Sequence, residues 1–238
     1  MSNPYFRFKQ FTVWHDKCAM KVGTDGVLLG AWVPVADNVT RSVLDVGAGT
    51  GLVALMIAQR NTEAEIDAVE IDKDACIQAS ENVEKSPFKN RIKVIHQSFP
   101  EYAIAKKYDL IVSNPPFFAH SLKSPDQKRN AARHNDTLPL RLLIGHATKM
   151  LSEYGRIALI LPAQLSEELD FIIATHGLYQ IRRTDVISAE GLISKRFLIE
   201  LSSKNLPGKR LATDTLVLET NERKRTLQYQ ELTKDFYL

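Results

Sequence analysis

Cysteine is scarce in this chain: only Cys18 and Cys76 occur among 238 residues, and they form no C-x-x-C pair. That scarcity argues against a zinc site built on thiolates, and we expect both thiols to be reduced. The sequence also has no apolar run long enough to span a bilayer and no signal-peptide core at its start. Internal repeats and low-complexity tracts are absent as well. These absences predict a cytoplasmic protein without a membrane segment.

Charge of either sign is not in strong excess. The formal net charge is +3, and 44% of the residues are hydrophobic. This composition fits one globular domain with a substantial core, spanning 1–238. The slight basic excess permits a nucleic-acid partner but does not require one.

The chain does contain an unusual strand end in Asp109-Leu-Ile-Val-Ser-Asn-Pro-Pro-Phe-Phe118. Its first half predicts a buried strand, which stops at the prolines because proline cannot donate to a sheet ladder. The residue before a proline is restricted to extended backbone, so Asn114 is held at the strand tip. Its amide oxygen and a neighbouring carbonyl can each accept one N–H of a flat amine, while a ring stacks on the amine's face. The alternative is a proline turn with Phe117 and Phe118 in the core.

A second unusual stretch is Ser42-Val-Leu-Asp-Val-Gly-Ala-Gly-Thr-Gly51, in which a buried strand runs into a glycine turn. Helical spacing follows, so strand, turn and helix predict the opening of a nucleotide-binding βαβ unit. Leu52 stands where a dinucleotide fingerprint has its last glycine or alanine, which favours a ligand without a pyrophosphate. About 20 residues further on, a strand ends at Glu70, where an acidic residue binds ribose hydroxyls. The alternative for Glu70 is a solvated acid after a strand.

The remaining patterns alternate between strand and helix, as expected for an α/β protein with a mostly parallel sheet. A helix over 24–32, capped by Thr24 or Asp25, follows short N-terminal strands within 6–14. Further helices are predicted over 73–85, 138–151, 164–176 and in the tail after 221. Further strands are predicted over 91–96, 108–113, 155–161, 178–187, 195–202 and 215–219, with 178–187 and 195–202 as antiparallel neighbours.

Basic residues gather in two places. Residues 116–135 form a polar stretch that we expect to be a loop over the site, and a second cluster opens the tail. The candidates for nucleic-acid binding are Lys123, Lys128, Arg129, Arg133, Arg223, Lys224 and Arg225. The alternative for the loop is a solvated surface segment, and its two histidines lack metal-ligand spacing, so no metal is expected.

The glycine turn, the acid and the Asn114-Pro-Pro-Phe117 corner together resemble the class I S-adenosylmethionine-dependent methyltransferases, in the branch with an N-P-P-[FY] motif. Phe8-Lys-Gln-Phe11, Lys21-Val-Gly-Thr-Asp25 and Leu29-Gly-Ala-Trp32 add a narrower resemblance to the bacterial family that methylates the amino group of adenosine 37 in tRNA1(Val). The resemblance covers most of the chain. It implies a Rossmann-like fold with a seven-stranded, mostly parallel sheet, helices on both faces and S-adenosyl-L-methionine as cofactor.

The resemblance also assigns roles to residues. Residues 1–40 would close the cofactor pocket, and 41–238 would form the core with C-terminal antiparallel strands and a terminal helix. The cofactor would be bound by Thr24, Asp25, Asp45, Gly47, Gly49, Gly51, Glu70, Ser98 and Asn114. These enzymes often carry an aspartate at the position of Ser98, whose hydroxyl can still accept a hydrogen bond from an adenine amino group.

In the implied reaction, an amine attacks the methyl group in line, while the Asn114 oxygen and the Pro115 carbonyl accept its two N–H bonds. Phe117 would stack on the flipped-out base. We expect a monomer that acts on tRNA. Alternatives that the sequence leaves open are a protein glutamine methyltransferase, another RNA or DNA amino-methyltransferase, and a non-catalytic cofactor-binding module.

Overall fold

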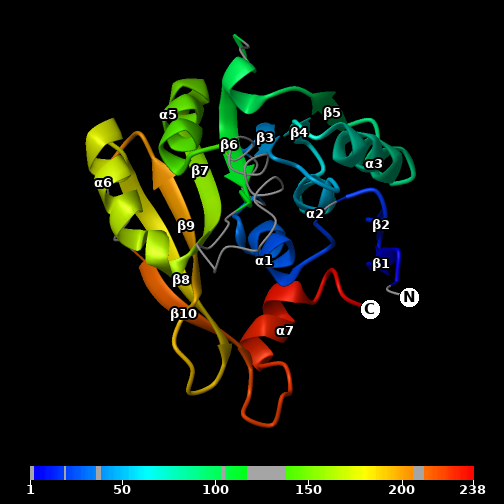
Figure 1. Cartoon of the computed structure of the whole chain (residues 1–238), viewed down its shortest axis with the longest axis vertical. Coiled ribbons are helices and arrows are strands. Elements are labelled where there is room, and N and C mark those ends of the chain that lie inside the picture. The colour runs from blue at the N-terminus through cyan, green and yellow to red at the C-terminus, as the bar shows by residue number, and fades with distance from the viewer. Residues whose placement is uncertain (1–2, 19, 36–38, 103–104, 117–137, 206–211) are drawn as a thin grey trace, which may run out of the picture.

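The computed structural model describes residues 3–18, 20–35, 39–102, 105–116, 138–205 and 212–238. Its centre is an eight-stranded sheet in the order β10-β8-β9-β7-β6-β3-β4-β5 (Figure 1). The strands are β3 (Ser42–Val46), β4 (Glu65–Glu70), β5 (Ile92–His96), β6 (Tyr108–Ser113), β7 (Leu151–Pro162), β8 (Tyr179–Ala189), β9 (Arg196–Ser202) and β10 (Ala212–Glu219). All neighbours pair in parallel except β9, which is antiparallel to both β7 and β8.

The antiparallel pairing predicted for 178–187 and 195–202 is therefore confirmed. The sheet has eight strands, one more than the seven expected, because β10 pairs in parallel with β8 along most of its length. This strand forms the outer edge of the sheet beyond β8, and a helix from the tail packs beside it. The strand predicted over 215–219 is this one, and its parallel pairing with β8 is defined by the crossover connection.

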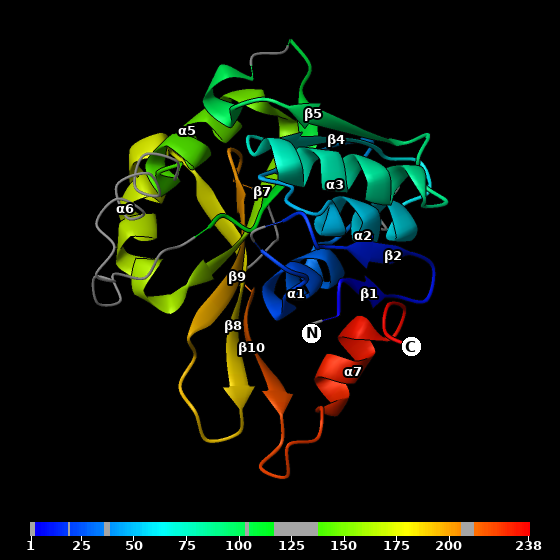
Figure 2. The same cartoon turned by 45° about the vertical axis from the view of Figure 1, so that its right-hand side comes forward.

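Helices cover both faces of the sheet, as expected (Figures 1 and 2). One face carries α1 (Thr24–Trp32), α2 (Leu52–Arg60) and α3 (Lys73–Glu84), and the other carries α5 (Leu140–Met150) and α6 (Ser166–His176). Two apolar clusters fill the space between helices and sheet, one on each side. Because β3, β6 and the second half of β7 are buried from both faces, their sequences are mostly apolar.

The cap predicted for the 24–32 helix is wrong, although the helix is present. Gly23 occupies the N-cap position in extended backbone, and no side chain caps the first turn. Asp25 lies in that first turn, but its carboxylate accepts a hydrogen bond from Arg196 on β9. A distant partner has replaced the local capping bond.

The two ends of the described chain lie side by side in both views (Figures 1 and 2). The strand pair β1 (Tyr5–Arg7) and β2 (Thr12–Trp14) adjoins the tail, where the Lys9 N–H donates to the Phe236 carbonyl at 2.9 Å. Phe8 stacks between Phe11 and Tyr237. The terminal helix α7 (Leu227–Thr233) packs against α1 and β10, which confirms a docked helix in the tail.

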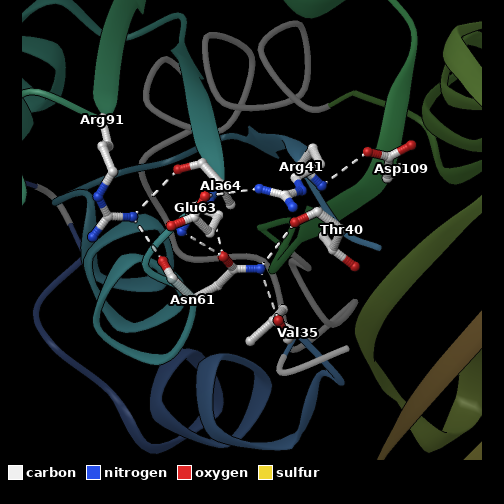
Figure 3. Close-up of polar contacts among 8 residues, drawn as sticks. All are labelled: Val35, Thr40, Arg41, Asn61, Glu63, Ala64, Arg91 and Asp109. Carbon is white, nitrogen blue, oxygen red and sulfur yellow. Dashed lines mark hydrogen bonds and ion pairs between the residues drawn. The ribbon is translucent and has the colours of Figure 1, made fainter. Parts of the chain in front are cut away.

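A buried amide organises the sheet edge opposite the strand ends that carry the candidate site. Asn61 caps the C-terminus of α2, and its side chain donates to the Val35 and Thr40 carbonyls and accepts from the Glu63 and Ala64 N–H groups, all at 2.8–2.9 Å (Figure 3). One side chain therefore satisfies four backbone groups of two loops. Arg91 donates to the Asn61 carbonyl at 2.7 Å and completes the cluster.

Candidate active site

The polar residues singled out in the sequence meet at one edge of the sheet. Val46 of β3 pairs with Val69 of β4 on one side and with Ser113 of β6 on the other. The next residue of each strand is Gly47, Glu70 and Asn114, so these three stand at the same level. Ligands of open α/β sheets bind at the carboxyl ends of the strands, where the crossovers separate.

The glycine turn leaves an open surface towards this edge. The turn contains Gly47, Gly49 and Gly51, whose φ angles are 70°, 55° and 78°. Residues other than glycine rarely adopt such values. A Cβ atom placed on Gly47 or Gly49 would meet no atom within 4 Å. The open space beside these two glycines is part of a cavity, and a side-chain methyl group at either position would fill part of that cavity. At Gly51 a Cβ would instead contact Ala79 of α3 at 3.5 Å.

Asp45 supports the turn from beneath. Its side chain is almost completely buried, and Oδ2 accepts a hydrogen bond from the Ala54 N–H of α2 at 3.1 Å. Burial raises the pKa of Asp45 to about 7, and the nearby Glu70 carboxylate adds to the rise, while the Ala54 N–H opposes it. The residue holds the start of α2 against β3.

Glu70 holds two backbone segments at once. Oε2 accepts from the Gly49 N–H and Oε1 from the Asp72 N–H, both at 2.8 Å. The side chain is 7% exposed, so these bonds are shielded from water. Each carboxylate oxygen can accept a second hydrogen bond, which leaves acceptor capacity for hydroxyl groups of a ligand.

Asn114 stands at the end of a strand that is anchored just before it. Ser113 is buried, and its hydroxyl donates to the Val46 carbonyl at 2.7 Å, which fixes β6 against β3. Pro115 is buried behind the asparagine, whereas the Asn114 side chain is half-buried and makes no hydrogen bond with another described residue. Gly26 of α1 lies opposite: a Cβ there would stand 4.0 Å from Asn114 Nδ2. The backbone that carries the amide is therefore fixed, and among the described residues the amide has no hydrogen-bond partner.

Two cavities meet at this amide. The first, of about 500 Å³, extends from the glycine turn past α1 to the start of β9, and Thr24, Asp25, Asp45, Lys195 and Arg196 line it. The second, of about 510 Å³, lies between the ends of β4 and β5 and is lined by Glu70, Ile71, Ser98, Phe99 and Leu142. Both cavities share Met20, Gly47, Gly49, Asn114, Pro115 and Pro116 as wall.

The structure brings most predicted site residues together. Thr24, Asp25 and Asp45 face the first cavity, Glu70 and Ser98 the second, and Gly47, Gly49, Asn114 and Pro115 both. Gly51 lies beneath the turn and lines neither. Phe117, Lys123, Lys128, Arg129 and Arg133 lie outside the described residues.

The basic cluster of the tail lies apart from the cavities. Lys224 pairs with Glu222 at 2.8 Å, and the Arg225 guanidinium lies 4.3 Å from the centre of the Tyr237 ring. Arg223 has a positive φ of 59° in the turn between β10 and α7. None of the three side chains lines either cavity.

Two site features were missed from the sequence. Lys195 and Arg196 line the first cavity from the start of β9, and Arg196 Nε donates to Asp25 Oδ2 at 2.6 Å. Burial raises the pKa of Asp25, and the guanidinium opposes that rise. Met20 spans the junction of the two cavities with half of its surface exposed. No local pattern marks these residues, because their roles depend on contacts between distant segments.

Within the described part of the chain, no group of three or more His, Cys, Asp or Glu side chains is arranged to hold a metal ion. A separate search of the same residues found no helix with the length and apolar character needed to cross a membrane.

The sheet order, the glycine turn and the acid at the end of β4 define a class I methyltransferase fold. A solved predicted O-methyltransferase from Agrobacterium tumefaciens superposes with a TM-score of 0.66 at 20% identity, covering 89% of this chain and 96% of that one. A glycopeptide N-methyltransferase complexed with S-adenosyl-L-methionine gives a TM-score of 0.54 at 13% identity, covering 78% and 90%. These likenesses establish the fold.

Sequence comparison narrows the assignment. Residues 27–169 match the methyltransferase small domain family. A tRNA1(Val) (adenine(37)-N6)-methyltransferase from Parabacteroides distasonis is 52% identical over 240 aligned residues, covering 100% of this chain and 99% of the relative. The chain therefore belongs to the tRNA1(Val) (adenine(37)-N6)-methyltransferase family, which confirms the resemblance drawn from the motifs.

Proposed function

We propose that this protein transfers a methyl group from S-adenosyl-L-methionine to N6 of adenosine 37 in tRNA1(Val). The observation that carries the proposal is the Asn114 amide at the meeting point of two cavities, where it makes no hydrogen bond with another described residue. The cofactor would occupy the second cavity and the shared wall and reach the part of the first cavity lined by Thr24, Asp25 and Asp45, and the acceptor base would lie in the rest of the first cavity. The names of the full-length relatives support the choice of tRNA.

The second cavity suits the adenosine part of the cofactor. Glu70 has free acceptor capacity for two ribose hydroxyls, and Ser98 offers a hydroxyl near the exposed Ile71 and the buried Phe99. Largely apolar walls with a few polar groups are typical of a site for an adenine ring. The open space at Gly47 and Gly49 is where a Cβ would collide with a bound methionine moiety, so the residues fit this cofactor.

Thr24, Asp25, Asp45 and Gly51 complete the set that we assign to the cofactor. Thr24 and Asp25 stand at the start of α1 and close the junction from the N-terminal side, as residues 1–40 are proposed to do. Asp45 and Gly51 act through the turn: Asp45 holds α2, and Gly51 allows the chain to pass Ala79. When bound, the cofactor supplies a methyl group carried on a sulfonium.

Asn114 and Pro115 act on the acceptor amine. The amide oxygen of Asn114 and the carbonyl of Pro115 accept its two N–H bonds, which orient the nitrogen lone pair towards the junction of the cavities. The same two acceptors favour the positive charge that develops on the nitrogen as its new bond forms. Alignment of two reactants accounts for about 7–11 kcal/mol in favourable intramolecular reactions, and the hydrogen bond that anchors Ser113 contributes to the alignment here by fixing the strand end that carries Asn114.

The RNA contacts extend the proposal to the substrate. Stacking of Phe117 on the base, and phosphate contacts by Lys123, Lys128, Arg129, Arg133, Arg223, Lys224 and Arg225, stay predictions from the sequence. An unpaired anticodon-loop base costs less to extrude than a base in a duplex, which makes it a suitable target for such a pocket. A tRNA substrate also implies a cytoplasmic enzyme, and we expect it to act as a monomer.

The test is methyl transfer from labelled S-adenosyl-L-methionine to an unmodified tRNA1(Val) transcript, with total DNA and total protein as competing acceptors. Nuclease digestion and mass mapping should locate one N6-methyladenosine at position 37. Asn114→Ala should abolish label, whereas Asn90→Ala, an exposed asparagine in the turn before β5, should not. If the label appeared in glutamine side chains of protein and not in tRNA, the substrate assignment would be wrong, while methyl transfer to an NH₂ group would be retained.

A further inference from the structure

The first cavity does not end at Asn114. It continues to the start of β9, where the side chains of Lys195 and Arg196 form part of its wall. Both residues are exposed, so their charges are accessible from the cavity and from solvent. The function assigned to Asn114 and to the glycine turn does not use these two cations.

The pair lies close to the catalytic amide. Gly26 of α1 lies beside Asn114, at 4.0 Å between its Cβ position and Nδ2. The preceding residue, Asp25, accepts from Arg196 Nε at 2.6 Å. The cations and the acceptor site are therefore linked through neighbouring residues of α1, and both line the same cavity.

The backbone that carries Lys195 and Arg196 is held by hydrogen-bonded pairing with the strands on both sides of β9. Arg196 pairs with Pro162 of β7 and with Val186 of β8. The Lys195 carbonyl accepts from the Ala163 N–H at 2.9 Å. This corner of the sheet presents both side chains from rigid strand ends, which favours a preorganised site.

The ion pair leaves donors available. Asp25 uses only Nε of the guanidinium, and no described residue accepts from the two terminal nitrogens of Arg196 or from the Lys195 ammonium. Asp25 also cancels one positive charge, so one net cation remains at this end of the cavity. A planar guanidinium held by one edge can offer its other edge to a phosphate.

We propose that Lys195 and Arg196 form a phosphate subsite for the nucleotide whose base is methylated. The inference rests on the proposed function, and it names the backbone phosphate beside the target adenosine as the group recognised. Phosphate contacts fix the position and orientation of a nucleic acid without reading its sequence. A glutamine side chain in a protein has no phosphate, so this subsite favours a nucleic-acid acceptor over a protein one.

The test compares Lys195→Ala, Arg196→Ala and Arg196→Lys with the matched control Lys204→Ala. Lys204 follows the other end of β9, at the opposite edge of the sheet, and pairs only loosely with Glu153 at 3.7 Å. Wild-type methylation of the anticodon stem-loop is measured first, since its absence would count against the proposed function and not against the subsite. Calorimetry with S-adenosylhomocysteine should give unchanged affinity for Lys195→Ala.

We expect Lys195→Ala to raise the KM for the stem-loop about 5- to 10-fold with little change in kcat, because one charge-assisted contact is lost. The slope of log affinity against log salt should flatten by about 0.7 for that variant. Arg196→Lys should keep most of the affinity that Arg196→Ala loses. Lys204→Ala should match wild type in every measurement.

A stem-loop with one uncharged linkage beside the target base provides the decisive arm. With wild-type enzyme it should bind at least as weakly as the normal stem-loop binds Lys195→Ala, and Lys195→Ala should cost much less affinity with this stem-loop than with the normal one. Fully additive losses, or an unchanged KM for both Lys195→Ala and Arg196→Ala, would overturn the subsite while leaving the methyltransferase assignment intact.

Discussion

Glu70→Gln replaces one oxygen of the carboxylate with an amino group and leaves the size of the side chain unchanged. In the structure both oxygens accept from backbone N–H groups, those of Gly49 and Asp72, at 2.8 Å. Whichever way the amide is turned, its NH₂ group faces one of these donors. One of the two bonds is therefore lost, and the ribose hydroxyls that we propose for this site would lose a charged acceptor.

The loss can be estimated for stability and binding separately. A hydrogen bond to a charged group contributes about 1.5–3 kcal/mol, and the 7% exposure of Glu70 means that water does not replace it readily. We expect the free energy of unfolding to fall by about that amount without ligand. The same range for one ribose contact corresponds to a cofactor affinity about 10- to 150-fold weaker.

The assays are urea unfolding of the ligand-free protein and calorimetry with S-adenosylhomocysteine. Glu65→Gln is the matched control, because Glu65 begins the same strand that Glu70 ends and is exposed at the opposite edge. If Glu70→Gln bound S-adenosylhomocysteine within threefold of wild type, Glu70 would not be the ribose acceptor. If it bound weakly but unfolded like wild type, the bonds to the glycine turn would be unimportant for the fold.

Three further outcomes follow from the site. Asn114→Ala should lower kcat at least 100-fold while calorimetry shows nearly unchanged cofactor affinity, since Asn114 faces the acceptor; turnover near wild type at saturating tRNA would refute its role. Asp45→Asn should remove a pH dependence: with a folded pKa of about 7, above the unfolded value, the native state holds the proton longer, so wild-type stability relative to the variant should fall as pH rises from about 4 to 7 in urea titrations. Asn61→Ala should lower the free energy of unfolding by about 2–4 kcal/mol, because four buried backbone groups lose their hydrogen-bond partner. Cofactor affinity measured by calorimetry should stay unchanged, and a large loss of affinity would show that Asn61 does more than stabilise the fold.

The part of the site that could be predicted lies at strand ends. Gly47, Glu70 and Asn114 each follow a run of apolar residues, and parallel strands bring their carboxyl ends to one edge. Each signal is local in sequence, and the fold class adds the rule that joins them. The positions relative to one another therefore follow without any knowledge of long-range contacts.

The part that could not be predicted depends on pairings between distant residues. Asp25 and Arg196 are 171 positions apart, and neither sequence neighbourhood contains a sign of the other. The same pairing explains why the local expectation of an Asp25 or Thr24 cap was wrong. Strand β10 was recognised only from 215 onwards because its first residues are polar and exposed, so hydrophobic alternation did not mark them.

The wall shared by the two cavities has a stereochemical consequence. Met20, Gly47, Gly49, Asn114, Pro115 and Pro116 belong to both, so two ligands bound side by side would touch through one opening. A group transferred directly from one ligand to the other needs no covalent intermediate on a side chain of the protein. With a methyl group made chiral by hydrogen isotopes, a single passage inverts its configuration, whereas a relay through a side chain would retain it.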